Sequence, residues 1–472
     1  MTLRTLFFVS LVAVPTMATA QQGTLTLRDA LTRADASGFR NRMADGAAAT
    51  ARGEATGALR GILPSLRLEG GFVRTTDPIG AFGTTLRQRA ITAADFDPAR
   101  LNRPDAVENV QASAVIEQPI FNADAWIGRR AASRGVAARV ANAEWTRIAT
   151  RVDVVRAYYG ATLAHERVAT LAVAARAAHA HERQAEAMVR QGLVTKSDAL
   201  LASIGAGEVD AQLADAEAEA RTAQRQLAVV LGADRATING IPDELPAAGH
   251  IRAVVSRDTG SNGDGHEAVR DRADLASAAL GLEVARLDVR RAQSLYAPRI
   301  NGVARYDWNS ASRLYGGDRS WTVGIMASWS PFAGANEIAE HQMTAGRASA
   351  ARAASEAARE QALLEAEQSE HALRAALTRL DITERAAAQS AEAHRIVGRK
   401  YEGGLATVVE LLDASATETR SALNFAAARY AVIMAAAERH KALGGDPAAL
   451  AALDDAPSAI VASPTQTQDQ HR

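Results

Sequence analysis

Four segments of the chain alternate between apolar and polar side chains, the pattern of a β-strand with one apolar and one polar face. In residues 320–330, every odd-numbered position from Trp321 to Trp329 is apolar, and every even-numbered position except Met326 is polar or glycine. The same alternation recurs, with few exceptions, in residues 66–72, 110–117 and 299–308. The sequence therefore predicts four amphipathic strands.

Tryptophans on the apolar faces indicate what these faces contact. Trp321 and Trp329 stand eight residues apart on one face, a distance of ~27 Å at ~3.3 Å per residue. Membrane β-barrels have an apolar band of about 25 Å between two aromatic girdles. Trp308, on the apolar face of residues 299–308, is expected to join such a girdle. A half-buried strand of a soluble sheet explains any one of these segments equally well, but the tryptophans favour lipid.

Two other segments predict very long helices. Residues 122–190 and 333–401 are rich in alanine and charged side chains and contain no proline. A continuous helix of either length would extend ~100 Å at ~1.5 Å per residue. A helix of this length must project or form a bundle, and its many alanines would allow close packing against neighbouring helices.

The chain contains two copies of one plan, each with a helix, a strand, a loop, a strand, a very long helix, a turn with glycine and a second helix. The turns carry a shared G-L-x-T motif, which comprises Gly192, Leu193 and Thr195 in the first copy and Gly404, Leu405 and Thr407 in the second. Phe121 precedes the first motif by 71 positions and Phe332 precedes the second by 72. The matched spacing indicates a duplication of the whole plan.

The domain organisation follows from these repeats. Residues 1–20, with Arg4, an apolar run and a final Ala18-Thr19-Ala20, predict a secretory signal peptide. Residues 21–231 form the first repeat, residues 232–265 the linker between the repeats and residues 266–443 the second repeat. The tail, residues 444–472, is expected to be disordered. Residues 75–108 have no clear period and are expected to form a long external loop.

Composition excludes several classes of function. A net charge of -1 with 23% charged residues provides no basic field for nucleic acid. The absence of cysteine excludes disulfides and thiolate metal sites. No catalytic motif is present, and His165, His179 and His181 do not have metal-ligand spacing, so we expect surface histidines. The sequence predicts no catalytic residue, no cofactor and no metal.

Four strands cannot close a membrane barrel, because the open edges would leave backbone groups unpaired in hydrocarbon. Two chains would give eight strands with a filled interior, whereas three chains would give twelve strands and a lumen. The predicted fold is therefore mainly α with a membrane β-barrel part. We expect a trimeric twelve-stranded barrel, with four strands from each chain, continued by a long α-helical barrel.

The doubled plan, Leu63-Pro64-Ser65 before the first strand, the residues around Phe121 and Phe332 and the two G-L-x-T motifs together resemble the TolC-type outer-membrane efflux family. The resemblance covers essentially all of the chain after the signal peptide. It implies a passive homotrimeric conduit in the lipid of the cell outer membrane, with its helical part in the periplasm. It also implies two partners, a periplasmic adaptor protein and an inner-membrane pump. Residues 77–102 are similar to an insertion found in one subgroup.

The resemblance also implies roles for particular residues. The two G-L-x-T turns would dock the adaptor. Glu410 and Asp413 fall on the family's ring of acids at the entrance, and Tyr401 and Asp198 are similar to positions that latch the gate. The latching arginine is absent, because its position is Ala406.

Simpler interpretations stand beside these roles. Gly192 and Gly404 are also suited to ordinary helix C-caps, and Glu410 and Asp413 to a solvated helix face. A type I protein secretion channel would share the fold, and a periplasmic coiled-coil scaffold would share the long helices. The sequence does not distinguish a drug, a metal ion or a protein as the exported substrate.

Overall fold

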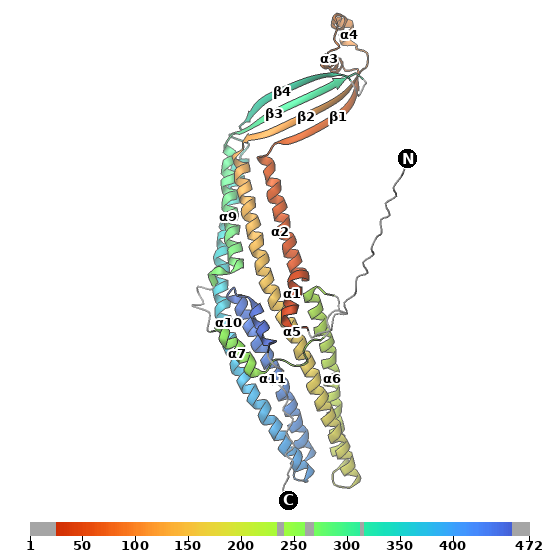
Figure 1. Cartoon of the computed structure of the whole chain (residues 1–472), viewed down its shortest axis with the longest axis vertical. Coiled ribbons are helices and arrows are strands. Elements are labelled where there is room, and N and C mark those ends of the chain that lie inside the picture. Colours follow the sequence, from red (N-terminus) through yellow and green to blue (C-terminus); the bar gives the residue numbers. More distant parts are fainter. Residues whose placement is uncertain (1–24, 234–239, 260–268, 312–315, 456–472) are drawn as a thin grey trace, which may run out of the picture.

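The computed structural model describes residues 25–233, 240–259, 269–311 and 316–455. The molecule is long and narrow, with a small sheet at one end and a bundle of long helices below it (Figure 1). The predicted signal peptide, residues 1–20, lies outside the described residues. Within the described part, no helix combines the length and the apolar character that a membrane span needs.

The sheet has four antiparallel strands in the order in which they occur along the chain. They are β1 (Ser65–Thr75), β2 (Val107–Phe121), β3 (Arg299–Ser310) and β4 (Asp318–Ser328). Each repeat contributes one hairpin, and the two hairpins meet where β2 pairs with β3. β1 and β4 are the two edges, and neither edge has a partner strand among the described residues.

The register of the strands places the predicted apolar residues on one face. Residues directly opposite each other in neighbouring strands share a face. One such row runs Leu68, Ala114, Tyr306 and Trp321 across the four strands. The next row runs Glu69, Ser113, Asp307 and Ser320 and lies on the opposite, polar face. The alternation in each strand therefore adds up to one apolar and one polar surface of the whole sheet.

Long helices continue directly from the strands. Next to the sheet, α2 (Phe39–Gly57), α5 (Ala123–Arg190), α9 (Ala273–Gln293) and α10 (Asn336–Glu402) lie side by side in this order. Farther away, α5 pairs with α6 (Lys196–Leu231) and α10 pairs with α11 (Val408–Ala442) as two helical hairpins. Three short 3₁₀ helices complete this part: η1 (Ala58–Gly61), η4 (Val269–Asp271) and η5 (Ser294–Tyr296).

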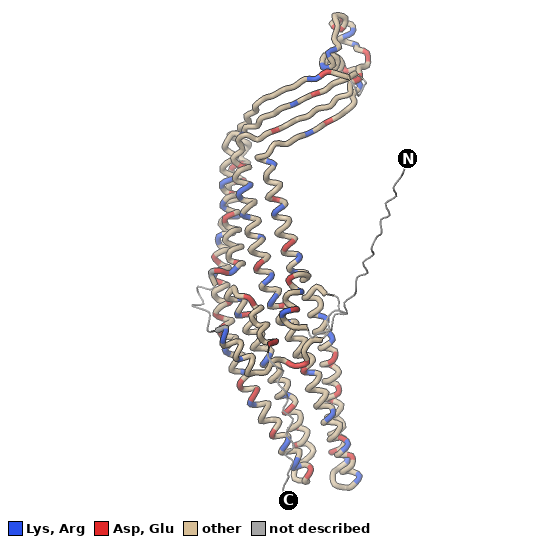
Figure 2. The backbone as a smooth tube through the Cα atoms, in the orientation of Figure 1, with Lys and Arg blue, Asp and Glu red and all other residues tan. Residues whose placement is uncertain are grey.

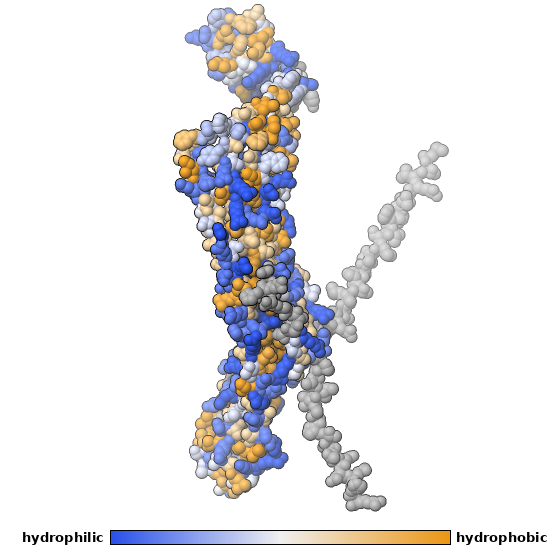
Figure 3. Space-filling view, turned by 90° about the vertical axis from the view of Figure 1, so that its left-hand side faces the viewer, coloured by the Kyte–Doolittle hydropathy of each residue, from blue (hydrophilic) through white to orange (hydrophobic). Residues whose placement is uncertain are grey.

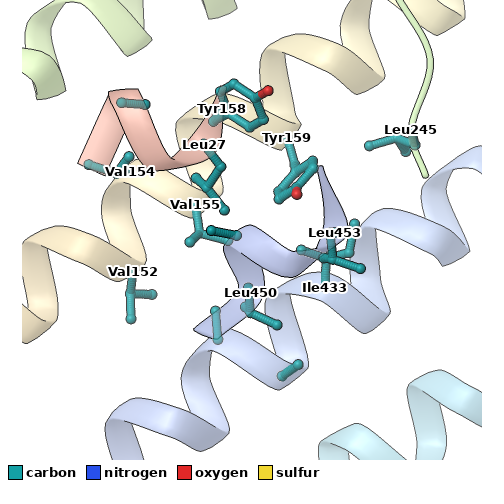
Figure 4. Packing of buried hydrophobic residues seen from close by; sticks show 14 of the residues in the cluster. Leu27, Val152, Val154, Val155, Tyr158, Tyr159, Leu245, Ile433, Leu450 and Leu453 are labelled. Atoms are coloured by element: carbon teal, nitrogen blue, oxygen red, sulfur yellow. The ribbon is translucent and has the colours of Figure 1, made fainter. Parts of the chain in front are cut away.

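The main hydrophobic core lies midway along the molecule, where short elements pack against α5, α6 and α11. These elements are α1 (Leu27–Ser37), α7 (Ala248–Thr259) and η6 (Pro447–Leu453). Figure 4 shows Tyr159, Leu27, Ile433 and Leu453 pointing toward one another from different helices. Tyr158 and Tyr159 are 1% exposed and meet edge to face with ring centroids 5.0 Å apart. The apolar side chains of both chain ends therefore complete one core.

The expected linker and the expected tail each contain a short helix. The expected linker, residues 232–265, contains α7, whose Ile251 is fully buried. The tail expected to be disordered, residues 444–472, begins with η6, whose Leu450 and Leu453 are buried. Disorder was the wrong expectation for residues 447–453, because their few apolar side chains fill gaps that only the assembled helices create. The rest of the tail, residues 456–472, lies outside the described residues.

The expected external loop, residues 75–108, also has structure of its own. It contains α3 (Pro78–Arg87), the 3₁₀ helix η2 (Ala93–Phe96) and α4 (Pro98–Asn102). Asp77 and Asp97 cap α3 and α4, and each is followed by a proline at the first helical position. Pairs of Asp and Pro in this order are start signals of short helices. These short helices were not predicted because the segment as a whole has no clear period.

Replacing Leu450 by alanine is expected to destabilise the folded protein by about 2–4 kcal/mol, because the cavity forms in a well-packed core. Leu450 is 1% exposed, so the substitution removes packing contacts on all sides of this side chain. Urea unfolding in mild detergent, followed by helical circular dichroism, measures the change. Leu86→Ala is the matched control, since Leu86 is 53% exposed. Equal unfolding midpoints for Leu450→Ala and the control would contradict the role of η6 in the core.

Candidate functional site

The two turns at the far end of the helical hairpins have the same backbone. Gly192 and Gly404 adopt left-handed conformations, with φ of 71° and 72°. The next residues donate back to the ending helices, Leu193 N to Met188 O at 3.0 Å and Leu405 N to Lys400 O at 2.8 Å. This is the pattern of a Schellman cap. The glycines are thus helix caps, and each cap presents the following leucine to solvent, 64% exposed at Leu193 and 81% at Leu405.

The threonine of each G-L-x-T motif starts the next helix. Thr195 caps α6 and Thr407 caps α11, each in a reciprocal capping box with the residue three positions on. The backbone N–H of Thr195 donates to Asp198 at 2.9 Å, and that of Thr407 donates to Glu410 at 2.7 Å. These bonds with Thr407, first from its backbone and then from its hydroxyl, lower the pKa of Glu410. Asp198 and Glu410 therefore both fix the geometry of a tip.

Tyr401, near the end of α10, is buried between the two helical hairpins. It is 2% exposed and packs with Ala185, Ala202, Val408 and Leu411 in a small hydrophobic cluster. Its hydroxyl is buried without a hydrogen-bond partner among the described residues. Burial, and after it the charge of Asp198, raises the pKa of Tyr401. The charge of Asp198 thus affects Tyr401, but no hydrogen bond joins these two expected latch residues in the described part of the chain.

Asp413 has different surroundings from Glu410, although both are exposed. Asp413 lines a cavity of about 520 Å³ between α5, α6 and α11, whose walls include Leu201, Ile204 and Leu412. Glu410 is held at the start of α11 by Thr407 and does not line this cavity. The two acids expected to form a ring therefore differ within one chain. Asp413 lines the cavity, whereas Glu410 is held by its capping box with Thr407.

The sequence did not reveal a histidine pair near the tips. His181 on α5 and His394 on α10 stack edge to face, with ring centroids 5.9 Å apart, and His394 bonds to Glu418. Burial, and after it His394, lowers the pKa of His181, which is half-buried with its Nε2 covered. The two histidines occupy nearly equivalent places in the two repeats, which was the available signal. The described residues contain no group of three or more side chains suited to hold a metal.

The polar face of the sheet carries charged side chains near the outer end of the strands. Arg305 donates to Asp307 at 2.8 Å, and both line a cavity of about 410 Å³ with Glu69 and Asn309. Arg87, at the end of α3, lines the same cavity. The external loop therefore reaches over the polar face of the sheet.

Two residues after α3 hold this loop across the strands. Gln88 donates to the carbonyl oxygen of Glu108 at 2.8 Å and to Asn109 at 2.9 Å, both on β2. Arg89 adopts a left-handed backbone, with φ of 51°, and its guanidinium lies 3.7 Å from the carboxylate of Asp318 on β4. This conformation is unfavourable for a residue with a Cβ, so the surrounding contacts must stabilise it.

The predicted girdle residues lie on the apolar face of the sheet or at its edge. Trp321, near the start of β4, is 75% exposed, and Trp329, directly after its end, is 64% exposed. The indole of Trp329 donates to the carbonyl oxygen of Tyr296 at 3.0 Å. Trp308 is half-buried and pairs with Arg319. Figure 3 shows hydrophobic side chains toward the sheet end and again at the tip end of the molecule.

Comparison with known proteins identifies the class to which this fold belongs. Residues 42–233 and 265–445 match the family model described as outer membrane efflux protein. The chain therefore belongs to the outer membrane efflux protein family. No protein of the curated set matches the sequence.

Solved structures with the same fold include three outer membrane proteins. VceC of Vibrio cholerae is 19% identical with a TM-score of 0.71, over 89% of this chain and 96% of that chain. The CmeC channel of Campylobacter jejuni is 15% identical with a TM-score of 0.75, over 89% and 85% of the two chains. The MtrE channel of Neisseria gonorrhoeae is 18% identical with a TM-score of 0.70, over 89% of each chain.

Family membership confirms several predictions from the sequence. The chain is an outer membrane efflux channel protein with two repeats, a four-stranded sheet and long periplasmic helices. The family consists of channels and not of enzymes. A periplasmic scaffold, which the long helices alone would have allowed, does not account for the sheet or for the family match.

Gly404→Ala is expected to strain the second tip by about 1–2 kcal/mol, because a Cβ disfavours the left-handed backbone. The strain does not come from a steric clash, since nothing lies within 4 Å of the added Cβ atom. Hydrogen exchange of the amides from Lys400 to Thr407 should become about tenfold faster. Gly207→Ala, an open position inside α6, is the control and should not accelerate exchange there. Unchanged exchange in Gly404→Ala would show that the cap does not hold the tip.

Proposed function

We propose that three copies of this chain form a passive conduit from the periplasm to the exterior. The observation that carries the proposal is the four-stranded sheet, which has one apolar face and two unpaired edges, β1 and β4. In hydrocarbon, each unpaired backbone group costs several kcal/mol. Edge-to-edge pairing of β1 with β4 of another copy removes this cost for both chains.

Three copies are the smallest closed assembly with a lumen. Eight strands enclose only side chains, whereas twelve leave an open interior. The polar row that contains Glu69 and Asp307 then faces the interior, and the row that contains Leu68 and Trp321 faces lipid. The layer of α2, α5, α9 and α10 continues each sheet, so three layers form the periplasmic part of the tunnel.

We further propose that both tips dock a periplasmic adaptor that links the conduit to an inner-membrane pump. Support comes from the repeated geometry, in which a Schellman cap and a capping box present one exposed leucine at each tip, Leu193 and Leu405. Two leucines displayed by rigid turns offer apolar anchors to a partner. A type I protein secretion system would use the same geometry.

The trimer prediction follows from the unpaired edges. After mild detergent extraction, the protein should migrate as a trimer that heating converts to monomer, because the contact between β1 and β4 is shared by different chains. Semi-native gel electrophoresis with and without heating measures the transition. A stable monomer that still conducts ions in a lipid bilayer would disprove the proposed function.

The docking prediction concerns the two exposed leucines. Replacing Leu193 and Leu405 together with aspartate should abolish export by the complete pump, because buried charges would replace apolar anchors. Ile79→Asp with Leu86→Asp is the control, as these exposed residues lie in α3, at the other end of the molecule. Export by cells and the amount of trimer are measured together. Normal export by the tip variant would remove the docking role.

The entrance prediction concerns Glu410 and Asp413. Three copies of each acid around a narrow opening would hold cations, so Glu410→Gln with Asp413→Asn should lower cation selectivity and relieve block by multivalent cations. Glutamine at position 410 preserves the capping box. Asp215→Asn with Glu217→Gln, two exposed acids of α6, is the charge-matched control. Single-channel recording decides, and selectivity identical to that of the unaltered protein would place both acids outside the conduction path.

A further inference from the structure

A cavity of about 470 Å³ opens between α5 and α9, close to the sheet. Its lining combines Trp126, three arginines, Arg129, Arg130 and Arg290, and two apolar side chains, Ile127 and Leu287. Trp126 is 53% exposed. The proposed conduit function uses none of these residues.

The cavity opens on the same side as the apolar face of the sheet. Asp124, in the first turn of α5, accepts a hydrogen bond at 2.7 Å from Arg299, which belongs to the polar set of β3. Trp126 follows Asp124 by two residues, about 200° around the helix. Trp126 therefore emerges on the side opposite to the polar face. Arg130 lies one turn beyond Trp126 on the same stripe of α5.

The cavity also lies at a defined depth below the strands. Trp329 marks the end of the apolar band and donates to the carbonyl oxygen of Tyr296, which is 45% exposed. Arg290 precedes Tyr296 by six residues, a distance of ~9 Å along the helix. The head-group layer beside the hydrocarbon core is about 5–8 Å thick. An arginine side chain at this depth can extend its guanidinium to the level of the lipid phosphates.

The three guanidinium groups take part in none of the ion pairs of the described residues. Neighbouring carboxylates are engaged elsewhere, Asp124 with Arg299 and Glu283 with Arg134. Among the residues that the structure describes, none forms an ion pair with Arg129, Arg130 or Arg290. Figure 2 shows further basic segments in the helices next to the sheet. This part of the surface therefore offers an anion several free donors.

We propose that this cavity binds the head group of an anionic glycerophospholipid from the periplasmic leaflet of the outer membrane. Arg129, Arg130 and Arg290 donate to the phosphate oxygens, for which the guanidinium fork is well suited. Trp126 packs beside the glycerol region, the usual depth of interfacial tryptophans. Continuity with the lipid-facing side of the sheet argues for a membrane lipid and against a soluble anion. The bound lipid fixes the depth of the channel in the bilayer.

The test compares lipid retention by the purified full-length protein. Native mass spectrometry measures how much phosphatidylglycerol remains bound, relative to phosphatidylcholine, after extraction from vesicles of equal parts of both. The variant Arg129→Gln with Arg130→Gln and Arg290→Gln should retain at least fivefold less phosphatidylglycerol. Arg183→Gln with Arg190→Gln and Arg225→Gln makes the same change of charge in the distant hairpin of α5 and α6 and should retain a normal amount.

Two further measurements make the result decisive. Inorganic phosphate, added at the same concentration as phosphatidylglycerol, should not displace the lipid. Displacement would indicate a site for soluble anions and overturn the proposal. Brominated phosphatidylglycerol should quench tryptophan fluorescence less in Trp126→Phe than in the unaltered protein, which tests the site without altering any arginine. Equal retention by the arginine variant and its control, or equal quenching with and without Trp126, would also overturn the proposal. A conducting trimer without lipid preference would leave the channel function intact.

Discussion

The need to pair every backbone N–H and C=O group in a medium without water governs this structure. The described part of the chain contains four strands, and hydrocarbon does not tolerate an open sheet edge. In the proposed assembly, other copies of the chain pair these edges and so stabilise the sheet in the membrane. The alternation of side chains makes the register equally important, because a slip of one residue would exchange the apolar and the polar face of a strand.

The helical part is also duplicated, but its long helices are stabilised in a different way from the sheet. Its helices are too long to be stabilised by one compact core, and much of their contact depends on alanines that allow close approach. The structure concentrates its large buried side chains at a single level, where α1, α7 and η6 surround the long helices (Figure 4). A buried ion pair at this level, between Arg429 and Glu166, also ties the second hairpin to α5. Beyond this level, α5 packs mainly against α6, and α10 packs mainly against α11.

The elements with a strong period were predictable from sequence. The helix expected over residues 122–190 is α5, Ala123–Arg190, and the alternating segments lie within the four strands. The duplicated glycine turns were equally visible, since only glycine readily adopts the left-handed backbone found at Gly192 and Gly404. These features depend on local sequence, and a single sequence is enough to read them.

Other features depended on contacts between distant residues or on a signal that was passed over. Leu450 is separated from Leu27 by almost the whole chain, and no local pattern predicts that both are buried in one core. The pairing of His181 with His394 is likewise a tertiary contact. The capping boxes could have been predicted, because Thr195 with Asp198 and Thr407 with Glu410 match the T-x-x-D/E pattern.

The position of η6 has a consequence for how the protein matures. Asp454, next to η6, accepts hydrogen bonds from the backbone N–H of Leu27 and from Tyr159, so the first and last described elements close on each other. A chain that emerges into the periplasm from its N-terminal end would therefore expose the apolar side chains of α1 and α5 for most of its translocation. The packing that α11 and η6 contribute to this core arrives last. During export, the uncovered apolar side chains are therefore a surface that periplasmic chaperones can bind. In a chain that stops before Pro447, this surface would stay uncovered.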